Sequence, residues 1–179
     1  ESNCLQFASP SFDASIWEIG MALLSGASLC ILDEERKSDT SLFKEFVQDN
    51  NITFITLPPA FLQLLEIEDL KGINTIVTGG EAIPLGVAKK FSSAYNYINA
   101  YGPTETSICA TTFKGEEIKD LVPIGEPIDN TQIYILNEAN KLMPIGVMGE
   151  LCIGGIGVAR GYLNREELTQ EKFIENPFK

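Results

Sequence analysis

Segments with strand character alternate with segments of helical periodicity through the first two-thirds of the chain. The strand-like segments are short and rich in β-branched residues, such as ITFITL at 52–57 and INTIVT at 73–78. Between them, apolar residues recur at helical spacing, for example over 13–24 and 40–48. Because strands separated by helices are joined by right-handed crossovers, this alternation predicts a mostly parallel sheet with helices on both faces.

The individual elements are short and closely spaced. Strands are expected at 28–32, 52–57, 73–78 and 95–100, and helices at 13–24, 40–48, 60–66 and 84–91. Residues 33–39 are expected to form a polar loop. The spacing of Ser15 and Glu18 predicts a capping box at the start of the first helix.

The pattern changes after about Phe113. Turn-forming Pro and Gly residues become frequent there and separate short apolar strands at 132–136 and 150–153. Only the polar segment 165–173 has helical character in this part of the chain. The C-terminal third is therefore expected to be a β-rich barrel or sandwich, so the chain contains two subdomains of different kinds.

Charge and composition argue against several classes of function. The chain has 25 acidic and 13 basic residues, a net charge of −12, which disfavours binding to nucleic acid and to an anionic membrane surface. It has no histidine, which excludes Ser-His-Asp catalysis and His-ligated zinc within these residues. No apolar run approaches about 18 residues, and the 4 cysteines form no CxxC pair. A reduced, cytoplasmic environment is expected.

Three of the expected strand-to-helix turns carry unusual residues, and ligands bind at such turns in open α/β sheets. The first, SFDAS at 11–15, places Asp13 at the start of a helix with Trp17 one turn later. Asp13 can interact with the helix dipole, or its carboxylate can bind a ligand cation in a partly apolar cleft. The residues alone leave both interpretations open.

The other two turns are VTGGE at 77–81 and NAYGPTET at 99–106. The paired glycines of the former allow close approach of a ligand. The latter offers a ring that can stack on a base, a hydroxyl for a phosphate, and a carboxylate for Mg²⁺, which prefers oxygen ligands. Each segment is also compatible with an ordinary turn.

Five stretches extend these turns in one order along nearly the whole chain. They are FDASIWE (12–18), TGGEAIP (78–84), NAYGPTE (99–105), IGEPIDNTQIYILN (124–137) and GELCIGGIGVARGYL (149–163). Together they resemble the adenylation domains of nonribosomal peptide synthetases, within the acyl-adenylate-forming superfamily. The resemblance implies a flavodoxin-like parallel sheet flanked by helices at 1–113, followed by a smaller β-rich, distorted-barrel subdomain at 114–179.

The resemblance also implies an amino-acid pocket. Asp13 would pair with the α-ammonium group of the substrate. The side-chain pocket would be lined by Ala14, Trp17, Thr56, Val77, Gly79, Ala100, Ile108 and Cys109. Because this lining holds no charged group, a charged substrate side chain would be buried unpaired. The set is similar to pockets for phenylalanine or a related aromatic amino acid, with tyrosine and tryptophan as open alternatives.

The same resemblance implies a nucleotide site in the NAYGPTE stretch. Tyr101 would pack against adenine, Asn99 would hydrogen-bond its amino group, and Gly102 would form the turn beside it. Thr104 would contact phosphate, and Glu105 would ligate Mg²⁺. In such domains an upstream phosphate-binding loop and a C-terminal lysine complete the catalyst. Neither is contained in this sequence, so this piece alone is expected to be inactive.

The reaction implied is activation of an amino acid with ATP to an aminoacyl adenylate. The acyl group would then pass to the phosphopantetheine thiol of a peptidyl carrier domain, with a condensation domain as a further partner. An acyl-CoA or aryl-acid ligase of the same superfamily is the alternative, but its substrates lack the amine that Asp13 would bind. A non-catalytic binding or interaction module is the alternative from another class. Arg160 and Tyr162 are interpreted as bracing the second subdomain.

Overall fold

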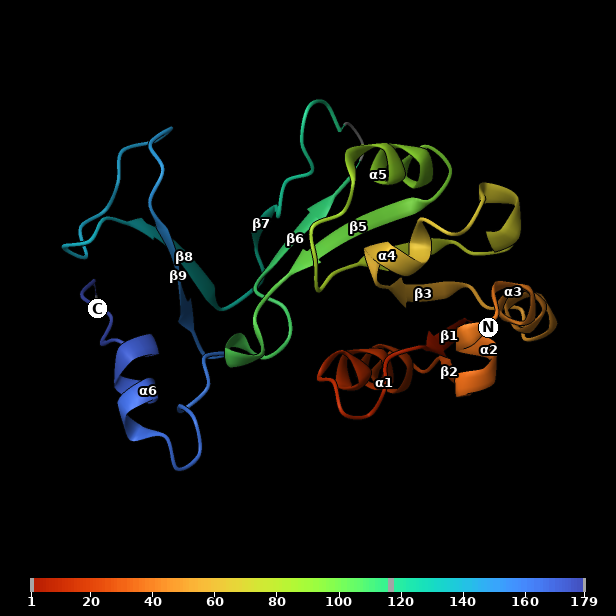
Figure 1. Ribbon diagram of the computed structural model, residues 1–179, viewed down its shortest axis with the longest axis horizontal. Coiled ribbons are helices and arrows are strands. Elements are labelled where there is room, and N and C mark those ends of the chain that lie inside the picture. The colour runs from red at the N-terminus through yellow and green to blue at the C-terminus, as the bar shows by residue number, and fades with distance from the viewer. Residues whose placement is uncertain (1, 116–117, 179) are drawn as a thin grey trace. The chain divides into compact units, whose positions relative to one another are not determined.

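The computed structural model describes residues 2–115 and 118–178, which fall into two compact units (Figure 1). The first unit comprises 1–101 and 111–126, and the second comprises 102–110 and 127–179. The segment 102–110 therefore groups with the C-terminal residues. The division of the domain at residue 113 remains a prediction.

The first unit is built on a seven-stranded sheet in the order β2-β1-β3-β4-β5-β6-β7. Neighbouring strands from β2 to β5 run parallel, and β6 runs antiparallel to β5. The strands are β1 (Asn3–Gln6), β2 (Ser28–Ile31), β3 (Phe54–Leu57), β4 (Thr75–Thr78), β5 (Asn96–Tyr101), β6 (Thr111–Lys114) and β7 (Glu126–Pro127). This mostly parallel sheet confirms the predicted fold class.

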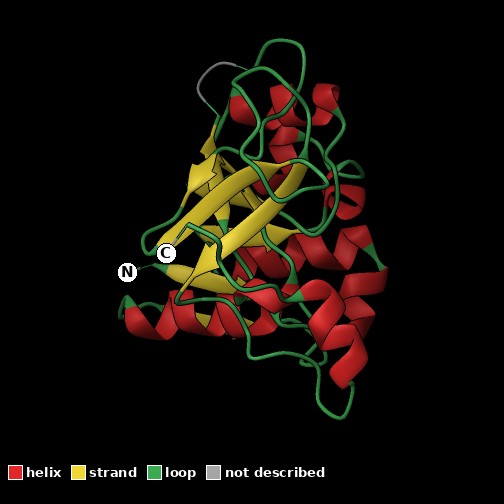
Figure 2. Cartoon of the chain, turned by 90° about the vertical axis from the view of Figure 1, so that its left-hand side faces the viewer, coloured by secondary structure: helices red, strands yellow, loops and turns green. Residues whose placement is uncertain are grey.

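Helices flank this sheet, as Figure 2 shows. They are α1 (Ala14–Leu24), α2 (Glu34–Ser38), α3 (Thr40–Asp49), α4 (Pro59–Leu62) and α5 (Leu85–Ser92), with a 3₁₀ helix, η1, at Ile67–Leu70. The crossover through α1 leads from β1 to β2, in the direction opposite to the crossovers that reach β3, β4 and β5. Right-handed crossovers therefore place α1 on the opposite face from α3 to α5. The crossover direction reverses between the paired strands β1 and β3, which is the switch point at which folds of this strand order bind ligands.

The core of the first unit fixes the strands that carry the candidate site residues. Phe43 and Val47 of α3 and Phe91 of α5 are fully buried against the sheet. Their partners include Ile55 of β3 and Ile76 of β4, which face each other in register and are also fully buried. Burial of such side chains contributes about 1.5–3 kcal/mol each. The carboxyl ends of these strands are therefore held in a defined register.

Two of the predicted elements differ from those observed. Residues 33–39 were expected as a loop but contain α2, because the Asp33 carboxylate accepts a hydrogen bond from the Arg36 N–H and so caps a short helix. The expected helix at 60–66 ends early, at Leu62, and the 3₁₀ helix η1 follows it. Both errors concern helices of only one turn, which local interactions decide.

The predicted capping box at the start of α1 is also wrong. The N-cap residue is Asp13, and its side chain makes no capping hydrogen bond. Ser15 lies inside the helix, where its hydroxyl donates to the carbonyl of Phe12 at 2.8 Å. Glu18 accepts hydrogen bonds from Phe7 and Ala8, which follow β1, instead of from the helix start. The spacing was right for a box, but the helix begins two residues earlier.

The second unit contains a two-stranded antiparallel sheet and a C-terminal helix. Strands β8 (Thr131–Leu136) and β9 (Glu150–Gly155) pair along their full length, and α6 (Glu166–Lys172) follows. These elements confirm the strands and the helix predicted for this part of the chain. Within the described ranges of both units, no helix combines the length and the apolar character that crossing a membrane requires.

Candidate active site

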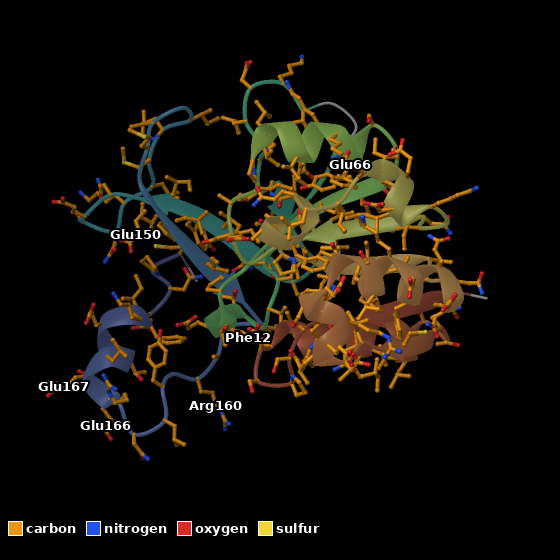
Figure 3. All side chains as sticks on the ribbon, turned by 45° about the vertical axis from the view of Figure 1, so that its right-hand side comes forward. Phe12, Glu66, Glu150, Arg160, Glu166 and Glu167 are labelled. Carbon is orange, nitrogen blue, oxygen red and sulfur yellow. The ribbon has the colours of Figure 1, made fainter. Side chains whose placement is uncertain are left out.

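Asp13 lies at the N-terminus of α1, in the turn that follows the carboxyl end of β1. Its backbone carbonyl accepts the first helical hydrogen bond, from Ile16 N–H at 2.9 Å. Its partly buried carboxylate makes no capping bond, and no hydrogen bond or ion pair joins it to any residue of 2–115 or 118–178. Phe12, labelled in Figure 3, precedes it and is exposed. The carboxylate is therefore available to a ligand.

Four other predicted pocket residues lie on this helix or on the strands β3 and β4. The indole Nε1–H of Trp17 donates to the hydroxyl of Thr56 on β3 at 3.2 Å. Thr56 faces Val77 of β4 in register, and Val77 is buried. Ala14, the first residue of α1, is partly buried. The hydrogen bond between Trp17 and Thr56, which lie 39 positions apart in sequence, thus joins α1 to a mainly apolar wall of predicted pocket residues.

Gly79 and Ala100 form a second predicted group, at the ends of β4 and β5. A Cβ atom built on Gly79 would lie 2.9 Å from the carbonyl oxygen of Ala100. The backbone of β5 therefore excludes a side chain at this position. Both residues remain small, as the predicted pocket requires for a large substrate side chain.

Asn99 on β5 is buried and held by the protein at both ends of its amide. Its Oδ1 accepts from the Thr78 hydroxyl at 3.3 Å, and its Nδ2 donates to the carbonyl of Pro123 at 2.9 Å. Each amide atom keeps one further hydrogen-bonding position, because a carbonyl oxygen has two lone pairs and an NH₂ group two protons. Tyr101, at the end of the same strand, exposes 38% of its surface. An oriented amide and an exposed ring are thus both present in the first unit.

The second unit holds the remaining predicted residues in a tightly folded segment. Thr104–Thr106 forms a 3₁₀ helix, η2, with Thr104 exposed. A Cβ atom on Gly102 would lie 2.6 Å from the carbonyl oxygen of Ile108 and 2.7 Å from Cα of Cys109, so only glycine fits. Ile108 itself has φ +78°, an unfavourable value for a β-branched residue. Such strain persists only where surrounding contacts enforce it, and it is commonest at functional sites.

Glu105 is fixed by contacts with the segment that precedes α6. The hydroxyl of Tyr162 donates to its carboxylate, and its carbonyl oxygen accepts from Ala159 N–H at 2.8 Å. Next to it, the Ser107 hydroxyl donates to the carbonyl of Gly157 at 2.7 Å. The hydrogen bond from Tyr162 lowers the pKa of Glu105, so its carboxylate is ionised at neutral pH.

The chemistry of Glu105 fits a magnesium ligand. Mg²⁺ is usually held by one or two carboxylates together with the phosphates of a substrate. No cluster of three or more acidic or thiol side chains suited to a metal occurs in the part of the chain that the structure describes. A single ionised carboxylate is consistent with an ion that arrives with a nucleotide. Tyr162 was expected only to support the second subdomain, and its hydrogen bond to the Glu105 carboxylate was not predicted.

The sequence did not indicate that a second acidic residue, Glu18, is buried next to the site. Glu18 of α1 is only 2% exposed, and its carboxylate accepts from the N–H groups of Phe7 at 3.1 Å and Ala8 at 3.0 Å. Burial raises its pKa to about 7. Its position in the FDASIWE stretch was the available signal, but the capping-box interpretation assigned it to the helix start.

Comparison with known proteins identifies the family. Residues 1–163 match the family described as AMP-binding enzyme. The chain belongs to this family. The matched range includes every residue predicted for the pocket and the nucleotide site, and also Tyr162.

The proteins similar to this chain include a synthase and solved structures of nonribosomal peptide synthetases. The chain is 51% identical over 175 residues to tyrocidine synthase 1 of Brevibacillus parabrevis, covering 96% of this chain and 16% of that protein. The AMPPNP-bound nonribosomal peptide synthetase FmoA3 superposes with a TM-score of 0.91 at 26% identity, over 99% of this chain and 21% of that one. An artificially fused adenylation–PCP di-domain from Klebsiella oxytoca superposes with a TM-score of 0.86 at 29% identity, over 99% and 35%. The chain thus corresponds to part of an adenylation domain of the nonribosomal peptide synthetase type.

The chain spans about a sixth of the length of the first of these relatives. What the whole synthetases make and bind is therefore a property of those proteins. The substrate and the partners of this chain are therefore proposed below.

Proposed function

We propose that this domain activates an amino acid with ATP, giving an aminoacyl adenylate and pyrophosphate, for nonribosomal peptide synthesis. The observation that carries the proposal is the carboxylate of Asp13 at the start of α1, which has no partner among residues 2–115 and 118–178 and lies one helical turn before Trp17. A carboxylate without a protein partner at the switch point of such a sheet suits the ammonium group of an amino acid. Substrates of acyl-CoA and aryl-acid ligases lack that group.

The pocket residues favour phenylalanine or a similar large aromatic amino acid. Trp17 and Val77 supply apolar surface, and Gly79 and Ala100 leave room for a ring. Thr56 already accepts a hydrogen bond from Trp17, which reduces its capacity to recognise a phenolic hydroxyl. A charged side chain would meet no partner in this set, at a cost of several kcal/mol.

The remaining predicted residues would serve the nucleotide. The Oδ1 atom of Asn99 would use its second lone pair to accept a hydrogen bond from the adenine amino group. Tyr101 would pack its exposed ring against the base. Thr104 would contact phosphate, and Glu105 would hold Mg²⁺. A bound Mg²⁺ would offset the negative charge of the phosphates.

The chemistry needs no nucleophile from the protein. The carboxylate oxygen of the amino acid attacks the α-phosphorus of ATP, a new P–O bond forms, and the bond to pyrophosphate breaks. The protein contributes positioning and charge compensation, so the absence of histidine is no obstacle. We further propose that these residues alone do not sustain the reaction, because no phosphate-binding loop with its lysine occurs among them.

The acyl group would then pass to the phosphopantetheine thiol of a peptidyl carrier domain, with a condensation domain acting next. The structural similarity to an adenylation–PCP di-domain supports the carrier as a partner. The proposed setting is the cytoplasm.

The test is pyrophosphate exchange into ATP that depends on the amino acid, measured for each proteinogenic amino acid with the full-length chain containing this domain. We expect phenylalanine or another large aromatic residue to give the highest rate. Asp13→Asn should reduce exchange at least about a hundredfold, the loss of a buried charge pair of about 3 kcal/mol. Asp120→Asn, at an exposed position, is the matched control and should have no effect. Full activity in the Asp13 variant would refute the proposal.

A further inference from the structure

Helix α1 buries the polar part of its surface. Its buried residues are Ser15, Glu18 and Ala22, which share one face at spacings of three and four. Ile16, Leu23 and Leu24 are 63%, 62% and 91% exposed. A helix on a sheet normally turns its apolar stripe inward. The two buried polar side chains therefore call for a specific explanation.

Both side chains bind the segment that leads to Asp13. Glu18 accepts from the N–H groups of Phe7 and Ala8, at the start of this segment. Ser15 donates to the carbonyl of Phe12, at its end, at 2.8 Å. One face of one helix thus holds both ends of 7–12, and Asp13 is the next residue. We call Ser15 and Glu18 the α1 clamp.

The groups that the clamp binds lie beyond the reach of the sheet. Strand β1 ends at Gln6, so the N–H groups of Phe7 and Ala8 follow its last strand residue. Oε2 of Glu18 accepts from both N–H groups, and its Oε1 lies 3.3 Å from the N–H of Ala8, where a glutamine would place an NH₂ group against that donor. Lys37 is the cation whose charge acts on Glu18. A carboxylate therefore suits these donors better than an amide does.

We propose that the α1 clamp positions the carboxylate of Asp13 for the substrate ammonium, with Glu18 as the principal positioning residue. The inference rests on the proposed function, in which Asp13 binds that group. The clamp residues do not touch substrate; they fix the backbone from which Asp13 projects. An error of about 1 Å in such a group costs up to about a hundredfold in rate.

Fold stability alone does not account for a carboxylate at this position. Burial disfavours its ionised form and raises its pKa to about 7, so near neutral pH the fold holds a charge that water would solvate better. Groups perturbed in this way concentrate at functional sites. The raised pKa of Glu18 therefore agrees with the positioning role that its hydrogen bonds to Phe7 and Ala8 indicate.

The experiment compares a substrate with its analogue that lacks the α-amine, using the full-length chain. The variants are Glu18→Gln, Ser15→Ala and Asp13→Asn, with Glu35→Gln on the exposed surface of α2 as the control. KM and kcat are measured for the best amino acid, for its des-amino acid (3-phenylpropanoate if that substrate is phenylalanine) and for ATP. The decisive quantity is the ratio of kcat/KM for the amino acid to that for the des-amino acid.

We expect Glu18→Gln to lower this ratio about tenfold, which corresponds to about 1.4 kcal/mol of lost discrimination. The KM for ATP should change less than about twofold, and Ser15→Ala should give a smaller effect of the same kind. A folding defect removes active enzyme equally for both substrates and leaves the ratio unchanged. If Glu18→Gln does not fold, Ser15→Ala and Glu18→Asp carry the test.

An unchanged ratio in folded clamp variants, together with a reduced ratio in Asp13→Asn, would overturn this inference and leave the proposed function intact. An unchanged ratio in Asp13→Asn would overturn both.

Discussion

Replacing Glu18 by glutamine should change how the stability of the fold depends on pH. Burial raises the pKa of this carboxyl from 4.5 to about 7, although the N–H groups of Ala8 and Phe7 and the charge of Lys37 act to lower it. The folded state therefore binds this proton more tightly than the unfolded chain does. The stability gained from it is complete below about pH 4.5 and is lost as the pH rises through about 7.

The size of the effect follows from the shift. One pKa unit corresponds to about 1.4 kcal/mol, so a change from 4.5 to about 7 is worth about 3 kcal/mol in all. Between about pH 5 and pH 8, the free energy of unfolding of the natural chain should fall by about 2–3 kcal/mol relative to that of Glu18→Gln. Glutamine does not titrate, so subtracting the two curves removes the contributions of the other acids.

Urea unfolding followed by tryptophan fluorescence is the suitable assay, because Trp17 is the 1 tryptophan of the chain and lies next to Glu18. Unfolding curves of both proteins are recorded at half-unit steps of pH. Two pH profiles that run parallel would refute the assignment of a raised pKa to Glu18. A difference that grows toward acid pH, with the natural chain gaining, would support it.

Two other substitutions test the packing of the site. Gly79→Ala should destabilise the fold by about 1–3 kcal/mol in thermal unfolding, because its Cβ would lie 2.9 Å from the Ala100 carbonyl oxygen. The control is Gly86→Ala in α5, where nothing lies within 4 Å of the Cβ position. This variant should be neutral or should stabilise the fold by up to about 1 kcal/mol. Tyr162→Phe removes the hydrogen bond that lowers the pKa of Glu105, so the loss of Mg·ATP binding on acidification should begin at higher pH in calorimetric titrations. An unchanged acid limb would show that Tyr162 does not control this carboxylate.

The sheet and most of its helices could be predicted because their signals are local. The β-branched segments at 52–57 and 73–78 became β3 and β4, and the periodic segment 40–48 became α3. The carboxyl end of the segment 73–78 indicated the turn that holds Gly79. Thr56 was predicted only from the family resemblance. Because ligands bind at the carboxyl ends of parallel strands, the predicted strands indicated where the site lies.

The contacts that tune the site could not be predicted in this way. Tyr162 lies 57 positions from Glu105 in sequence, and no periodicity connects the two. The partnership of Trp17 with Thr56 spans 39 positions and depends on the crossover that brings α1 beside β3. Helix α2 depends on one capping carboxylate in a segment whose composition is that of a loop.

Helix α1 shows why periodicity gives a helix without giving its orientation. Ile16, Ile19 and Leu23 recur at helical spacing and correctly predict the helix, yet Ile16 and Leu23 are exposed while Ser15 and Glu18 are buried. The sequence pattern measures where apolar side chains gather, but the orientation follows from the N–H groups and the carbonyl that the 7–12 segment leaves for the helix to bind. Near neutral pH a buried Glu18 weakens the fold, and an apolar residue there would leave two N–H groups without an acceptor. The polar face of α1 therefore fixes the path of the chain into Asp13 through its contacts with the 7–12 segment.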